Sequence, residues 1–292
     1  MENNKTGVYK KRSLWVDVWK RLRRNKTAVT GMAVFIVITL ACLTSPLYYD
    51  YNTNIVGARV ANQFVGPSRE YLLGADELGR DILARILWGG RTTLLVSFSG
   101  LAIAVVFGTI IGTAAAYYGR FSDMIIMRIV DVIMAVPPIL LMITLATIMN
   151  PSTSSLIFVV GFGLLPTQTR MVRGQVLQIV DSEFIEAARV QGASDFKIIR
   201  KHILPNALSP IITTIILDIG YAVLVISTLS FLGLGVQPPD PEWGSMLSKG
   251  KDFLRFAYHI ATYPGIALVV TLMSLTLVGD GVRDAMDPRM KR

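Results

Sequence analysis

A carboxylate inside an otherwise apolar segment is the residue that most clearly suggests chemistry. Asp218 is the one charged residue in the stretch 206–239, and it lies twelve positions after Asn206. That separation is roughly 18 Å along a helix, and a charge so deep in a membrane costs about 2.5–3.5 kcal/mol. We therefore expect Asp218 to face water or the interior of a bundle. It would be either a contact for a cationic substrate group or the hydrogen-bonded partner of a neighbouring helix.

Three residues in an earlier segment are further candidates. Arg128 and Asp131 are three positions apart, so we expect them to form a structural ion pair on one face of a helix. Met134 follows them and is, with Asp218, our candidate to line a substrate path. Packing in a core or against lipid is the more common role of an isolated methionine.

The sequence contains no recognisable catalytic or metal-binding motif. It has one cysteine, Cys42, and two histidines, His202 and His259, so a cysteine or histidine metal cluster is not expected. The phosphate-binding pattern G-x-x-x-x-G-K-[ST] is missing as well. We expect this chain to catalyse no reaction and to bind neither metal nor cofactor.

The elements that must position these residues are membrane-spanning helices. The chain is 52% hydrophobic and 17% charged, which is too apolar for one soluble core. Runs without charge reach the roughly 20 residues that cross a bilayer, and the longest has a turn signal at Asn150–Ser155 that predicts a helical hairpin. With the stretch around Asp218, the sequence predicts an all-α integral membrane protein with six spans, from the runs 28–47, 92–119, 132–169, 206–239 and 260–279.

The distribution of basic residues predicts the orientation of these spans. Nine of the 29 Lys and Arg residues lie between Lys5 and Lys26, which favours membrane topology over nucleic-acid binding as the reason for the net charge of +9. With both termini in the cytoplasm, 21 basic residues lie inside and eight outside. The predicted segments are a basic N-terminal segment (1–27), a first span (28–47), an outer loop (48–91), a five-helix core (92–282) and a tail (283–292).

One inner loop, residues 181–205, has the pattern of two short helices. Ser182 can cap a helix over 183–191, Gly192 can end it in a left-handed conformation, and Ser194 can begin a second helix that ends before Pro205. The first helix would have one apolar side, with a shallow surface suited to docking against another protein. The residues of that side are Phe184, Ile185, Ala187 and Ala188.

The 181–205 loop also carries Glu186-Ala187-Ala188, Gly192 and Leu204-Pro205. This pattern resembles the coupling-loop signature of ABC importer permeases. Other segments are similar to the C-type permeases of the peptide and nickel importer branch, namely Leu73–Asp81, Tyr117–Gly119 with Arg128–Asp131, Leu229–Gly235 and Gly279–Pro288. The chain departs from that pattern at Leu165, Ile226 and Thr276, which lie in predicted spans and therefore bear on substrate rather than fold.

The resemblance implies a type I ABC importer permease (MetI-like) fold in a bacterial cytoplasmic membrane. The implied partners are a homologous second permease, two ATPases that use ATP and Mg²⁺, and an extracytoplasmic solute-binding protein received by the outer loops. A peptide is the expected substrate. A nickel or metal chelate is the alternative within the family, and an ion-coupled secondary transporter that uses Asp218 is the alternative outside it.

Overall fold

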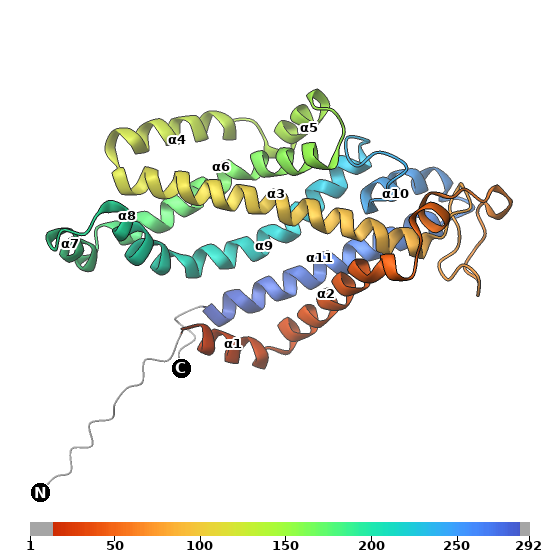
Figure 1. Cartoon of the computed structure of the whole chain (residues 1–292), viewed down its shortest axis with the longest axis horizontal. Helices are drawn as coiled ribbons and strands as arrows, with labels where there is room; N and C mark the ends of the chain where they lie inside the picture. Colours follow the sequence, from red (N-terminus) through yellow and green to blue (C-terminus); the bar gives the residue numbers. More distant parts are fainter. Residues whose placement is uncertain (1–13, 287–292) are drawn as a thin grey trace, which may run out of the picture.

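The computed structural model describes residues 14–286 and shows an elongated bundle of helices (Figure 1). Parts of the predicted N-terminal segment and tail, residues 1–13 and 287–292, lie outside the described residues. The α-helices are α1 (Leu14–Arg24), α2 (Lys26–Thr44), α3 (Ile82–Tyr118), α4 (Arg120–Met134), α5 (Pro138–Ile148), α6 (Thr153–Val180), α7 (Glu183–Val190), α8 (Asp195–Ile198), α9 (Leu204–Phe231), α10 (Trp243–Gly250) and α11 (His259–Met286).

Within residues 14–286, five helical segments are long and apolar enough to cross a membrane. A sixth span, the third in chain order, is present as a bent pair of helices, in which α4 and α5 meet at an angle of 80°. Sequence analysis predicted the first helix of a hairpin over the run 132–169 and did not anticipate this break. Pro137 and Pro138 follow one another at the break, and proline both lacks the helical N–H donor and pushes the preceding residue out of the α conformation.

Helices α3 and α6 share the most extensive contact among the described helices, because small residues allow their backbones to approach. A Cβ atom on Gly108 would lie 2.7 Å from the Cβ of Gln168, and one on Gly112 would lie 2.5 Å from the carbonyl oxygen of Thr169. Gly108 and Gly112 are four positions apart in the sequence, a spacing typical of close packing between membrane helices, and the structure shows that packing. Close packing of this kind supplies the attraction that the hydrophobic effect cannot supply between helices in lipid.

The first span packs against the last one. Gly31 of α2 faces Leu277 of α11, with only 2.7 Å between a Cβ built on the glycine and the Cβ of the leucine. The amphipathic helix α1 precedes α2 and buries Leu22 against Val282. Sequence analysis described this region only as polar and basic, because an amphipathic helix rich in Lys and Arg has no continuous apolar run.

The two ends of the bundle are built differently. Helices α1, α7 and α8 and the end of α11 lie at one end, whereas residues 45–81 and α10 lie at the other (Figure 1). Helix α3 begins at Ile82, ten residues before the predicted start of that span, so the second half of the predicted outer loop is partly helical. We call the end with residues 45–81 and α10 the outer cap, in keeping with the predicted orientation.

Candidate functional site

The 181–205 loop is fixed firmly to the bundle. Ile185 is fully buried and Ala188 is 8% exposed, and both pack in a cluster with Ile198 and the ends of the neighbouring spans. The hydroxyl of Tyr117 at the end of α3 donates to the carboxylate of Asp195 at 2.7 Å. These contacts attach the loop to the ends of the spans.

The side of the same loop that faces away from the bundle exposes three large apolar side chains. The exposed fractions are 46% for Phe184, 84% for Val190 and 70% for Phe196, and Glu186 and Ala187 are exposed beside them. Sequence analysis placed Phe184, Ile185 and Ala188 on one side, but the structure divides them between an anchoring side and a free side. Val190 and Phe196 were not predicted as part of the surface.

The turn between α7 and α8 depends on Gly192. Its φ is +76°, and the N–H groups of Gly192 and Ala193 donate to the carbonyls of Arg189 and Ala188 at 2.9 and 3.1 Å, which is a Schellman helix end. The predicted second helix does not end before Pro205. A π-helical turn (Ile199–Ile203) continues directly into α9, where Leu204 and Pro205 occupy the first positions and the missing N–H of proline is tolerated.

Asp218 lies halfway along α9 and lines a cavity of about 210 Å³ between α5, α6 and α9. The Nε2 of Gln168 donates a hydrogen bond to its Oδ2, so the expected partner on a neighbouring helix is present. Met134, at the end of α4, is not among the residues that line this cavity. Met142 of α5 is fully buried and fills the space beside Gly163.

The predicted ion pair between Arg128 and Asp131 is replaced by a pair between helices. Asp131 of α4 accepts from Arg170 of α6, and Arg128 is exposed. A second pair joins the same helices, where Arg173 donates to both carboxylate oxygens of Asp123 at 2.8 and 2.6 Å. The spacing rule within one helix could not reveal partners some forty to fifty positions away.

A buried ionic cluster organises the outer cap. Asp76, Arg80 and Arg85 are each 3–4% exposed. The Oδ2 of Asp76 accepts from Nε of Arg80 at 2.7 Å and lies 3.4 Å from Nε of Arg85. Arg85 also donates to the carbonyl oxygen of Ile55, so the cluster joins the start of α3 to the loop before it.

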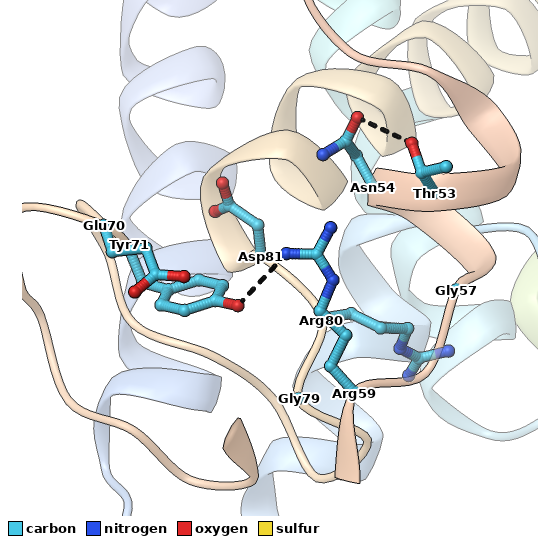
Figure 2. Close-up of a pocket in the computed structure, with 9 residues that line it drawn as sticks. All are labelled: Thr53, Asn54, Gly57, Arg59, Glu70, Tyr71, Gly79, Arg80 and Asp81. Atoms are coloured by element: carbon cyan, nitrogen blue, oxygen red, sulfur yellow. Dashed lines mark hydrogen bonds between the residues drawn. The ribbon is translucent and has the colours of Figure 1, made fainter. Parts of the chain in front are cut away.

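A polar pocket of about 80 Å³ opens beside this cluster. Figure 2 shows the side chains around it, with the guanidinium of Arg59 reaching the hydroxyl of Tyr71 at 3.4 Å. Groups of both charges surround the pocket, and its lining residues are Thr53, Asn54, Gly57, Arg59, Glu70, Tyr71, Gly79, Arg80 and Asp81.

Glu242 is the deepest carboxylate of the outer cap and was not predicted. It is fully buried and caps α10 by accepting from the N–H of Ser245 at 3.0 Å. It also accepts from the hydroxyls of Thr93 on α3 at 3.1 Å and Ser227 on α9 at 3.3 Å. One side chain thus joins three helices. The cluster Pro238–Pro241 that precedes it signals a loop and gives no indication of burial.

We expect Glu242 to make the stability of the protein depend on pH. Burial raises the pKa of the Glu242 carboxyl above its ordinary value of 4.5. The folded state therefore holds this proton at pH values where the unfolded state has released it, and stability falls as pH rises from about 4.5. Thermal unfolding between pH 4.5 and 7 should show a smaller loss for Glu242→Gln than for the native chain. Equal pH dependence of the two proteins would contradict this role.

Together, the long apolar helices and the structured loop at one end of the bundle are those of a multi-pass membrane protein. Residues 104–292 match the family described as binding-protein-dependent transport system inner membrane component. Residues 13–67 match the N-terminal TM domain of oligopeptide transport permease C. The chain belongs to this family of inner-membrane transport permeases, in agreement with the resemblance found in the sequence.

Curated relatives support the assignment over almost the whole length. The dipeptide transport system permease protein DppC of Alkalihalophilus pseudofirmus is 39% identical, with 96% of this chain and 91% of that protein covered. The glutathione transport system permease protein GsiD of Pectobacterium atrosepticum is 38% identical, with 96% and 93% covered. Among solved structures, the inward-facing MetNI methionine ABC transporter aligns with a TM-score of 0.55 and 21% identity over 70% of this chain and 96% of that chain. The fold is therefore that of the ABC importer permeases.

Proposed function

We propose that this chain is one of two related permease subunits of an ATP-driven importer for peptides. Support for the substrate class comes from the relatives, which are permeases for dipeptides, peptides and glutathione. They favour a peptide over the nickel or metal-chelate alternative. In this assignment the two permeases enclose the translocation path, to which Asp218 belongs, and Met134 lies at the break where α4 turns toward α5.

The observation that carries the proposal is the free apolar side of the 181–205 loop. Phe184, Val190 and Phe196 are exposed, whereas Ile185 and Ala188 are buried against the ends of the spans and hold the loop to them. An exposed apolar surface on a rigidly attached helix suits docking into a groove of a partner. That partner would be a cytoplasmic ATPase, which would supply the sites for ATP and Mg²⁺.

Closure of two such ATPases on ATP would bring the two α7 helices together. Because α6 leads into α7 and α8 continues into α9, the movement would pass directly to the two spans that border the Asp218 cavity. The result is a rigid-body change between inward and outward access. The outer cap, with the pocket of Figure 2, would receive an extracytoplasmic solute-binding protein.

Reconstitution tests the proposal. Proteoliposomes that contain both permeases, both ATPases and the binding protein should take up labelled peptide only when ATP is present inside with the ATPases. Labelled nickel, supplied alone or as a chelate, should not accumulate. Peptide uptake by this chain without ATPases, driven by an ion gradient, would contradict the proposal and would support a secondary transporter.

A further inference from the structure

Asp218 and Gln168 both line one cavity. Asp218 accepts one hydrogen bond, from Gln168, and none of the ion pairs formed within residues 14–286 includes it. Gln168 is 1% exposed, and its Oε1 is buried without a hydrogen-bond partner. A buried acceptor without a donor is destabilising, so both oxygens are suited to a ligand that brings several donors.

The surroundings of these groups restrict the ligand. The cavity of about 210 Å³ is well above the roughly 10–15 Å³ that one water requires, so it has room for more than an ion. Its few oxygen groups fall short of the six to eight that Ca²⁺ requires. The cavity also has apolar walls, which can accommodate a carbon chain. Its lining residues are Pro138, Gly163, Leu164, Thr167, Gln168, Asp218 and Tyr221.

The cavity opens on a side of the bundle that lipid cannot cover at low cost. Thr167 and Tyr221, which line the cavity, are both exposed, and Asp218 in the same lining is partly exposed. A carboxylate at mid-membrane depth needs water or protein in front of it. This side is therefore the one that faces the translocation path.

We propose that the Asp218–Gln168 cavity binds a positively charged amino group of the transported substrate. An ammonium carries three donors and no acceptor, which matches the carboxylate of Asp218 and the unpartnered Oε1 of Gln168. The amide of Gln168 supplies one such donor to Asp218. The inference rests on the proposed peptide import, and the ammonium belongs either to the peptide N-terminus or to a lysine side chain.

The test uses the complete reconstituted importer and two labelled dipeptides, one with neutral side chains and one containing lysine. Asp218→Asn keeps the size of the side chain and removes its charge, so we expect uptake to fall at least tenfold, whereas Asp218→Glu stays within a few-fold of the native rate. The matched control is Asp280→Asn, which neutralises an exposed carboxylate of α11 and should leave uptake unchanged.

The pattern of loss identifies the source of the ammonium. Loss with both peptides assigns the N-terminus, and loss with the lysine peptide alone assigns the side chain. Native uptake of both peptides by Asp218→Asn would overturn the proposal. If that variant does not assemble, Thr167→Lys is the second test. It places a tethered ammonium at the cavity and should therefore block uptake. Native uptake by Thr167→Lys would equally overturn the proposal. Failure of the proposed function itself is distinguishable, because the native complex would then import neither peptide.

Discussion

Gly192→Pro is expected to abolish ATP-dependent uptake while the chain still inserts into the membrane. Gly192 has a φ of +76°, whereas proline is fixed near −65°. The substitution also removes the N–H that donates to Arg189 at 2.9 Å. The turn would open and α7 would lose its direction relative to α8. Because α7 carries Phe184 and Val190 on its free side, the docking surface would be lost with it. Uptake by reconstituted complexes measures the effect, which should exceed tenfold.

A matched variant separates the backbone from the side chain at this position. Asparagine tolerates the left-handed conformation, and a Cβ on Gly192 would meet nothing within 4 Å. Gly192→Asn should therefore retain most of the uptake, and the ATPases should co-purify with it. If Gly192→Pro transports as well as Gly192→Asn, the geometry of this loop does not govern coupling.

Asp76→Ala should produce the largest loss of stability in the outer cap. The carboxylate accepts from the backbone N–H groups of Leu78 and Arg80 at 2.9 and 3.0 Å, and it compensates the buried guanidinium groups of Arg80 and Arg85. Removing one partner of a buried ionic group leaves charge without compensation, a cost of about 3–5 kcal/mol. We expect the apparent Tm of the purified permease to fall by several degrees, together with its yield.

The adjacent acidic residue provides the control. Glu77 also pairs with Arg80, at 3.1 Å, but its side chain is 19% exposed, compared with 5% for that of Asp76. Solvent screening reduces the contribution of such a pair to the free energy of unfolding, so Glu77→Gln should change Tm only slightly. Equal effects of the two substitutions would show that burial of Asp76 does not organise the cap.

The spans were predictable because length and apolarity alone identify them. Lipid imposes both requirements on any helix that crosses it, and the glycine pair at Gly108 and Gly112 revealed where two of them approach. The bend between α4 and α5 escaped prediction because the apolar run continues through it. Pro137 and Pro138 indicate a helix break at this position, but an analysis of hydropathy alone does not detect it.

The candidate sites were predictable only in part. The composition of the 181–205 loop indicated its two helices, but the division between anchoring residues such as Ile185 and exposed ones such as Val190 depends on how the loop meets the spans. Similarly, the depth of Asp218 followed from its position, whereas its contact with Gln168, fifty residues earlier, required the packing of α6 against α9. Glu242 lies between helices α3, α9 and α10, and the sequence around Glu242 does not indicate its burial.

Cross-linking at Val190 tests the central claim most directly, namely that the 181–205 loop docks on an ATPase. The one native cysteine, Cys42, is 1% exposed, so a thiol-directed cross-linker should react at an introduced cysteine. Val190→Cys in the assembled complex should give an adduct of this chain with an ATPase subunit. Val60→Cys is the control, since Val60 is 64% exposed at the outer cap, and it should give no such adduct. An adduct from Val60→Cys but not from Val190→Cys, or reaction of Val190→Cys with an impermeant reagent applied from outside intact cells, would contradict the account.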